Sequence, residues 1–299
     1  MKYVWRVLVI VLCALVVLGF AVMSRLLPAK QNSMFFELYP EMKLVQENTF
    51  EMSKVHRISI DYGAEDIEIY PSDSTDLKIR EYMNYEPSEG EMTTLWRTGD
   101  TLEITEGDRD GVIFFAFGTQ KKIEIYIPQE YQDALAIELG SGKVEVAMDM
   151  TLSEFELNVQ SGAAVLGKIE AEALDIDLSS GHIRADELKG KQDVEVSSGK
   201  ADLGLVAGEG RYHCSSGQIE MKVSELVGNM DVNVSSGQID IALPKEAEFL
   251  YQADVKTGDV DTYFEATSRG DEYEASVGND PSKQIKVNVS SGGVDIEQY

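Results

Sequence analysis

The sequence is poor in the residues that most often carry enzyme chemistry. Its 299 residues include two cysteines and three histidines, and His56, His182 and His213 are spread along the chain. No Cys/His cluster has the spacing of a zinc site, and no G-x-S-x-G motif of a serine hydrolase occurs. We therefore expect no metal site and no catalytic residues.

The two cysteines are also too few to form a disulfide framework. Cys13 lies in an apolar run at the start of the chain, and Cys214 lies far away among the repeats described below. They are not expected to pair within one chain, so cysteine usage does not tell whether the compartment is oxidising.

Basic residues are scarce compared with acidic ones. The chain has 26 Lys and Arg against 53 Asp and Glu, a formal net charge of −27. Residues 1–30 contain four basic and no acidic residues, so residues 31–299 carry −31. This acidity disfavours DNA, RNA and anionic lipid headgroups as partners of the main domain.

A long apolar run occurs only at the start of the chain. Residues 7–23 read VLVIVLCALVVLGFAVM, and as a helix they would span roughly 26 Å, close to the core of a bilayer. Lys2 and Arg6 precede the run, which favours an inside N-terminus and an extracytoplasmic main domain. A cleavable signal peptide is the alternative, but it should end in small residues, whereas this run is followed by Ser24 and Arg25. We therefore expect residues 1–30 to be an uncleaved single-pass anchor in the cell membrane.

A motif of alternating apolar residues around a Ser-Gly pair, or a close variant of it, recurs from about residue 135. Successive glycines are 18 to 21 residues apart, except for the last two, which are 34 apart. The copies occupy residues 137–146, 157–166, 176–185, 194–203, 212–221, 232–241, 253–262 and 287–296. We expect a structural turn at the glycine of each copy: Gly142, Gly162, Gly181, Gly199, Gly217, Gly237, Gly258 and Gly292.

A period near nineteen residues, with alternation of period two inside it, predicts one solenoid coil per repeat. Side chains alternate between the two faces of a strand, so Val194, Val196 and Cys214 should point inward and Glu195 outward. The fold class predicted is all-β, a single-stranded β-solenoid of about eight coils. The chain bends sharply at each glycine, and there we expect a positive φ that a Cβ would strain. The neighbouring serines are interpreted as corner residues that bond to the backbone.

The domain organisation follows from these patterns. Residues 1–30 are the anchor, 31–47 a stalk, 48–134 an N-terminal β-layer and 135–299 the solenoid, with an irregular insertion at about 263–284. The β-layer contains alternating segments that do not keep the register of the repeats. We expect it to continue into the first coil and to cap it, because an open solenoid end is an unpaired strand edge.

The segment IPQEY at 127–131, followed by IELGSGKVEV and a run of V-x-V-S-S-G-x-I units, resembles the DUF4097 family of candidate adhesins. The resemblance covers residues 48–299 and implies a β-strand-repeat protein of the bacterial envelope, related to the toastrack domains of envelope-stress systems. It implies adhesion, scaffolding or stress signalling, and it supplies no catalytic residues. The 34-residue gap between Gly258 and Gly292 departs from the regular pitch.

The outward positions of the repeats form two predicted rows. Carboxylates one coil apart repel each other, and Ca²⁺ could bridge them, whereas the alternative is a solvated face that resists aggregation. We expect no cofactor, with calcium as the open alternative. The row before the glycines contains Glu138, Asn158, Asp177, Glu195, His213, Asn233 and Asp254; the row after them contains Glu145, Val165, Arg184, Asp202, Glu220, Asp240, Asp261 and Asp295.

Two further segments have open interpretations. Residues 111–118, GVIFFAFG, are either a buried strand or an apolar tip that contacts a partner or a membrane. Arg269-Gly270-Asp271 is a tripeptide known from integrin-binding adhesins, which also arises easily by chance.

The function predicted is a non-enzymatic binding, scaffolding or envelope-stress regulatory module. Its expected partners are the membrane, through residues 7–23, and an envelope or cell-surface protein, with the oligomeric state left open. The alternatives are a surface adhesin that acts through its repeats and a polysaccharide-acting β-helix enzyme. An enzyme of that kind needs clustered carboxylates and a nearby base, and Arg184 is the only Arg or Lys in the two rows.

Overall fold

The computed structural model describes residues 41–88, 90–107 and 119–299, which form strands, turns and loops. This confirms the all-β class. The predicted anchor segment 7–23 and the apolar segment 111–118 lie outside the described residues. Within these ranges, no helix is long and apolar enough to cross a membrane.

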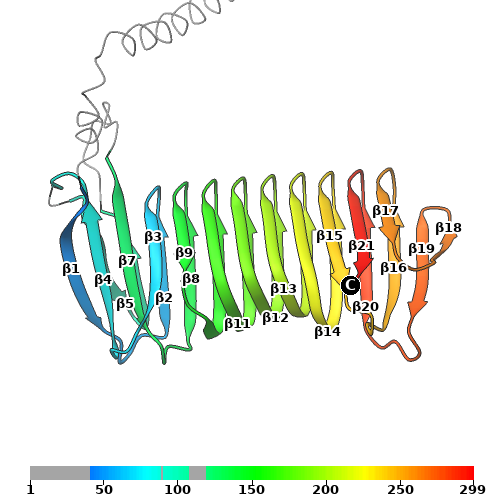
Figure 1. The fold of residues 1–299 in the computed structure, drawn as a ribbon, viewed down its shortest axis with the longest axis horizontal. Coiled ribbons are helices and arrows are strands. Elements are labelled where there is room, and N and C mark those ends of the chain that lie inside the picture. Colours follow the sequence, from blue (N-terminus) through cyan, green and yellow to red (C-terminus); the bar gives the residue numbers. More distant parts are fainter. Residues whose placement is uncertain (1–40, 89, 108–118) are drawn as a thin grey trace, which may run out of the picture.

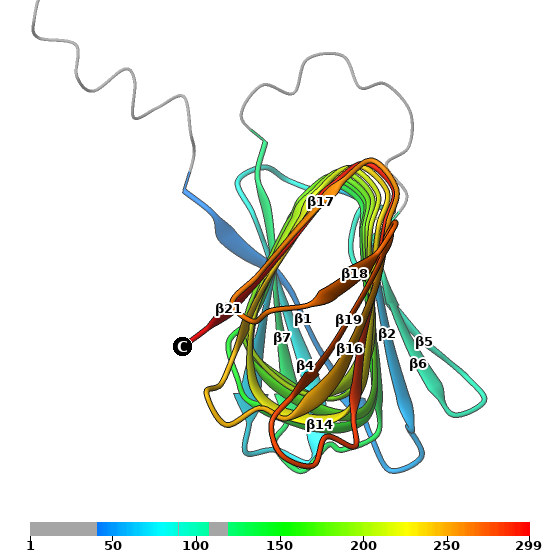
Figure 2. The same ribbon diagram turned by 90° about the vertical axis from the view of Figure 1, so that its right-hand side faces the viewer.

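The repeats form a flattened rod with one coil per repeat, as predicted (Figures 1 and 2). Each coil runs along one face, turns at a corner and returns along the other face. Strands of successive coils pair in parallel on both faces, with register shifts within the β11–β12 and β13–β14 pairs. The strands of this regular part are β8 (Ala134–Leu139), β9 (Lys143–Val146), β10 (Met150–Val159), β11 (Ala163–Leu178), β12 (His182–Val196), β13 (Lys200–Cys214), β14 (Gln218–Val234) and β15 (Gln238–Leu243).

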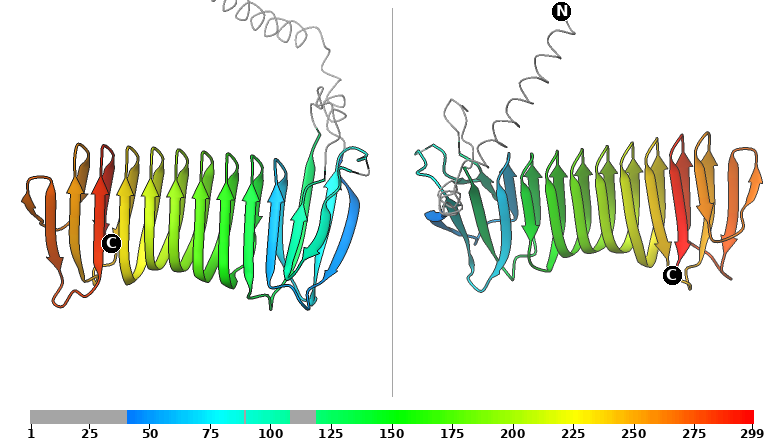
Figure 3. Two further views of the ribbon diagram at one scale, coloured as in Figure 1. Left: turned by 180° about the vertical axis from the view of Figure 1, so that it is seen from behind. Right: turned by 45° about the horizontal axis from the view of Figure 1, so that its top comes forward.

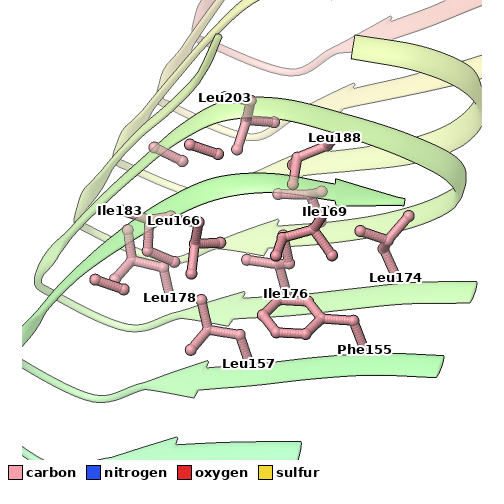
Figure 4. Packing of buried hydrophobic residues seen from close by; sticks show 14 of the residues in the cluster. Phe155, Leu157, Leu166, Ile169, Leu174, Ile176, Leu178, Ile183, Leu188 and Leu203 are labelled. Carbon is pink, nitrogen blue, oxygen red and sulfur yellow. The ribbon is translucent and has the colours of Figure 1, made fainter. Parts of the chain in front are cut away.

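The core is a continuous column of apolar side chains along the rod axis. Val194, Val196, Tyr212 and Cys214 are all buried, which confirms the predicted inward face, while Glu195 is exposed. The register places Val194 beside Tyr212 and Val196 beside Cys214 in the next coil. Figure 4 shows the same packing of buried apolar side chains in the coils from β10 to β13. Each fully buried Val, Leu or Ile contributes about 1.5–3 kcal/mol, so the stack of coils supplies most of the stability.

The N-terminal strands continue this stack, as predicted for a layer that runs into the first coil. β2 pairs in parallel with β8, and β3 with β9, residue to residue. The prediction that residues before the repeats are out of register is therefore wrong for residues 57–72. The strands of this end are β1 (Lys43–Glu51), β2 (Arg57–Tyr62), β3 (Asp66–Ser72), β4 (Asp76–Met83), β5 (Thr94–Thr98), β6 (Thr101–Thr105) and β7 (Lys121–Pro128).

At the N-terminal end, the last strands on both faces pair antiparallel with their neighbours. β6 and β7 pair in parallel with the outer sides of β2 and β3. β5 then pairs antiparallel with β6, β4 antiparallel with β7, and β1 antiparallel with β4. β1 begins at Lys43, inside the segment that we expected to be a stalk.

The C-terminal end does not follow the order of the sequence. β20 lies between β14 and β16, and β21 lies between β15 and β17. The coil of Gly292 is therefore inserted between the coils of Gly237 and Gly258, which the sequence had suggested to be neighbours. The strands are β16 (Phe249–Val255), β17 (Asp259–Thr262), β18 (Thr267–Arg269), β19 (Glu272–Val277), β20 (Gln284–Val289) and β21 (Gly293–Gln298).

The irregular insertion accounts for the 34-residue gap. Its strands β18 and β19 form a hairpin, and β19 pairs antiparallel with the outer edge of β16. This hairpin and β1 lie at opposite ends of the rod (Figures 1 and 3).

Candidate functional site

The first outward row, which we call the pre-corner ladder, runs along the face whose strands lead into the corners. The register confirms the predicted neighbours from Glu138 to Asn233, but Asp254 does not follow Asn233 as predicted, because Asn288 lies between them. Asn288 donates a hydrogen bond from its side-chain amide to the amide oxygen of Asn233, at 2.9 Å. In spatial order the ladder contains Glu138, Asn158, Asp177, Glu195, His213, Asn233, Asn288 and Asp254.

The second row, the post-corner ladder, runs along the opposite face. Its order also differs from the sequence, because Asp295 lies between Asp240 and Asp261. Lys200 stands beside the ladder and forms an ion pair with Glu220, with 2.7 Å between Nζ and Oε1. In spatial order the ladder contains Glu145, Val165, Arg184, Asp202, Glu220, Asp240, Asp295 and Asp261.

Glutamine amides link the carboxylates of the post-corner ladder. Gln218 Nε2 donates to Glu220 Oε1 at 2.7 Å and to Asp240 Oδ2 at 2.9 Å. Gln238 Nε2 donates to Asp240 Oδ1 at 2.9 Å and to Asp295 Oδ2 at 3.0 Å. Partial burial, and then the charges led by that of Asp240, raise the pKa of Asp295. Each amide has two donor hydrogens, so the repulsion between coils is eased without a cation.

The acidic part of the pre-corner ladder also has raised pKa values. Burial raises the pKa of Asp177, and the charges of Glu195 and Asp193 raise it further. The pKa of Asp175, the next outward residue on the same strand, is raised by burial and by Asp177. No three His, Cys, Asp or Glu side chains in the described ranges are placed to hold a metal ion.

The corner glycines are required by the contact between coils. A Cβ on Gly181 would lie 1.9 Å from the carbonyl oxygen of Gly162, and one on Gly199 would lie 2.5 Å from that of Gly181. The glycines with positive φ in the described residues are other ones, so the expectation of a positive φ at the corners is wrong. The carbonyl of each corner packs against the next glycine instead. The corner glycines, in spatial order, are Gly142, Gly162, Gly181, Gly199, Gly217, Gly237, Gly292 and Gly258.

An exposed serine precedes the glycine in most corners, and these corners line one edge of the rod (Figure 1). Their main-chain N–H groups bond to the preceding coil; for example, Ser198 N donates to Ser179 O at 2.8 Å. The serines are therefore held by the stack and not by local bonds. These exposed serines are Ser141, Ser161, Ser180, Ser198, Ser216, Ser236 and Ser291.

The histidines and Arg184 do not converge on one site. His182 and Arg184 lie on the face of the post-corner ladder, whereas His213 lies on the opposite face. His213 Nε2 is, however, 3.2 Å from Ser215 Oγ. Sequence reasoning missed this contact, because Ser215 lies just beyond the end of β13.

The Arg269-Gly270-Asp271 tripeptide lies at the turn of the β18–β19 hairpin. All three residues are exposed, and Gly270 has a φ of +67°. The carbonyl oxygen of Asp271 accepts a hydrogen bond from Val255 N at 2.9 Å, which ties the turn to the end of β16.

These features define a rigid all-β repeat protein whose two broad faces carry rows of polar side chains. The chain belongs to the Toastrack DUF4097 family, whose model matches residues 55–297. No functionally curated protein matches the sequence.

Two solved structures are similar in fold. A candidate adhesin from Parabacteroides merdae is 16% identical, with a TM-score of 0.52, and the match covers 86% of this chain and 96% of that one. A candidate adhesin from Bacteroides fragilis is 15% identical, with a TM-score of 0.50, and the match covers 87% of this chain and 99% of that one.

Proposed function

We propose that this protein is a non-enzymatic binding and scaffolding module of the cell envelope, held at the membrane by residues 7–23. The observation that carries the proposal is the pair of ladders, which run along both faces of a fully paired stack of coils. Adjacent ladder residues are about 4.8 Å apart, so a partner meets a long, regular and rigid surface. The candidate adhesins with the same fold support binding as the general role.

The composition of the ladders indicates the chemistry of the partner. The post-corner ladder ends in the acidic run Asp202, Glu220, Asp240, Asp295 and Asp261. A surface of this kind favours a partner that supplies cations or hydrogen-bond donors, and complementary charge raises the rate of association.

Crosslinking from intact cells tests the proposal. A photoreactive amino acid replaces Asp202 on the post-corner ladder or, as a control, Glu172, which is exposed on β11 but lies outside both ladders. We expect a discrete adduct from position 202 and none from position 172. Absence of an adduct from every position of both ladders, with the chain folded and on the cell surface, would refute the proposal.

The proposed location has its own test. Protease added to cells without a wall should remove the described domain and leave the anchor fragment in the membrane. Protection of the domain, or its release into the medium at full mature length, would contradict an outward-facing anchored module.

An enzymatic role is the second candidate, and the Ser215–His213 contact gives it specific residues. A separation of 3.2 Å is compatible with a nucleophile and its base, but catalysis also needs an electrophile-stabilising group within reach. We expect the full-length chain to show no esterase, glycosidase, lyase or protease turnover. Turnover that is lost in Ser215→Ala and kept in the neighbouring Ser216→Ala would favour the enzyme.

A further inference from the structure

The last coil in the sequence, which we call the C-terminal coil (residues 284–298), is not the last coil in space. Its two strands fill a slot between coils that precede them in the chain. β20 pairs with β14 on one side and β16 on the other, and β21 pairs with β15 and β17. The end of the rod is therefore complete only when this segment is in place.

The slot depends on the C-terminal coil for both main-chain pairing and core packing. Ile285, Val287, Val289, Val294 and Ile296 are all buried. Without them, four neighbouring strands would each expose an unpaired edge and an apolar row. Open edges and apolar surface of this kind recruit another strand with the same pattern.

The outer wall of the slot has contacts of its own. Phe264 packs edge-on against Phe249 and Tyr251, with ring centroids 5.4 and 5.0 Å apart. The β18–β19 hairpin pairs with the outer edge of β16. These contacts do not involve the C-terminal coil and would keep β16 joined to the hairpin when the slot is empty, whereas β17 takes its main-chain pairing from β21.

A single connection, which we call the hinge (residues 278–283), joins the C-terminal coil to β19. Its residues are mostly exposed, and Gly278 has a φ of +93°. The carboxylate of Glu248 holds it closed by accepting hydrogen bonds from Asn279 N at 3.1 Å and Asp280 N at 3.3 Å. β19 and β20 are separated only by β16, about 10 Å, whereas six extended residues reach about 20 Å. The hinge is therefore long enough to let the C-terminal coil leave the slot of its own chain.

We propose that the C-terminal coil exchanges between two copies, so that the partner bound at this end of the rod is a second copy of this chain. The exchanged coil would make the same hydrogen bonds and bury the same side chains as in one chain. The two states then differ only in the hinge and in the cost of association, which falls when copies are concentrated at a surface.

The position of the slot gives the exchange a role in adhesion. The described chain starts with β1 at one end of the rod, and the C-terminal coil lies near the other (Figures 1 and 3). Exchange would join two rods at the ends opposite β1, which suits contact between two surfaces that each hold a chain through its N-terminal segment. This role rests on the proposed function, because it needs chains anchored outside the cell.

Cysteine pairs across the slot test the exchange. Asn233 and Asn288 are register partners, and parallel partners lie about 4.8 Å apart, within the range for a disulfide. Two differently tagged full-length chains, one with Asn233→Cys and one with Asn288→Cys, are produced together and treated with a mild oxidant. We expect a heterodimer in which the peptide with residue 233 is joined to the peptide with residue 288.

Two controls fix the interpretation. Asn158→Cys lies on the same ladder but away from the slot, and it should form no such link to position 288. The double variant in a single chain should form an internal disulfide, which reports the closed monomer. An internal disulfide without any link between chains would overturn the exchange, and failure of both links would overturn the strand order itself.

The hinge offers a second, independent readout. Glu248→Ala removes the carboxylate that closes the hinge, so the cross-linked heterodimer should increase severalfold, whereas Glu246→Ala, exposed two residues away, should leave it unchanged. Equal yields from the two variants would contradict control by the hinge. The two proposals can fail separately. If no heterodimer forms but the photo-crosslinked adduct at position 202 does, the exchange is wrong and the ladder function stands. If the heterodimer forms but no ladder position gives an adduct, the ladder function is wrong and the exchange stands.

Discussion

Replacing Gly199 by alanine should destabilise the rod more than any change at an exposed corner residue. The new Cβ would lie 2.5 Å from the carbonyl oxygen of Gly181 and 2.7 Å from Cδ2 of Leu178. The same carbonyl accepts a hydrogen bond from Lys200 N at 3.1 Å. The carbonyl cannot move away without weakening this bond, because the coils are paired on both faces.

The structure sets the magnitude of the effect. Overpacking of a well-packed site costs about 1–3 kcal/mol, and weakening one main-chain hydrogen bond costs about 0.5–1.5 kcal/mol. The two together give about 2–4 kcal/mol. For a domain of this size, 1 kcal/mol lowers the melting temperature by about 2–4 °C, so we expect a decrease of roughly 4–16 °C.

Thermal unfolding of the full-length chain, followed by far-ultraviolet circular dichroism, measures the effect. The matched control is Ser198→Ala, because Ser198 is exposed and adjacent to Gly199 in the same corner. We expect this control to change the stability by less than about 0.5 kcal/mol. Equal melting temperatures for the two variants would refute the close approach of the coils as the reason for glycine at the corners.

Three further predictions follow from the two faces of the strands. Val196→Asp should cost several kcal/mol because it buries a carboxyl group, whereas Glu195→Ala should cost little, and equal thermal shifts would show that the faces are assigned wrongly. Burial covers the Cys214 thiol and raises its pKa, so alkylation should begin only when the domain unfolds, and rapid labelling of the folded chain would contradict this. Burial and then Glu195 raise the folded pKa of Asp177 above its ordinary 3.8, so its contribution to stability falls as the pH rises through that range. Asp177→Asn should therefore stabilise the chain at pH 7 and much less at pH 4, and a difference independent of pH would disprove the raised pKa of Asp177.

The regular part of the fold could be predicted because its information is local. Alternation within each strand assigns the inward column, and the repeated glycine marks the corner. The conformation of the glycines could not be predicted, because the constraint acts between Gly199 and Gly181, which belong to different coils. A sharp turn within one coil had suggested a positive φ, but contact between coils explains the glycine.

The order of the coils at the two ends could not be predicted from the sequence, for a different reason. The repeats of Gly258 and Gly292 have the same inward pattern, so either could pair with the coil of Gly237. The bulky rings of Phe249 and Tyr251, which pack on Phe264, favour the outer position for the coil of Gly258. At the other end, residues 57–72 lack the Ser-Gly pair, so the search for repeats missed a coil that stacks in register.

The candidate site was predictable in part. Both ladders follow from alternation, and their composition was visible in the sequence. The bridges from Gln218 and Gln238 were missed, because each amide reaches a carboxylate of its own coil and one of the next. The neighbours of Asp295 were also missed, since they depend on the order of the last coils.

Complementation of a deletion strain tests the central claim that the protein acts by binding from the membrane and not by catalysis. One variant carries Ala at His182, Arg184, His213 and Ser215, and a second lacks residues 1–30. We predict that the first restores the wild-type phenotype and that the second, although folded, does not. Failure of the folded first variant, together with a turnover activity that the wild-type chain has and this variant lacks, would contradict the account.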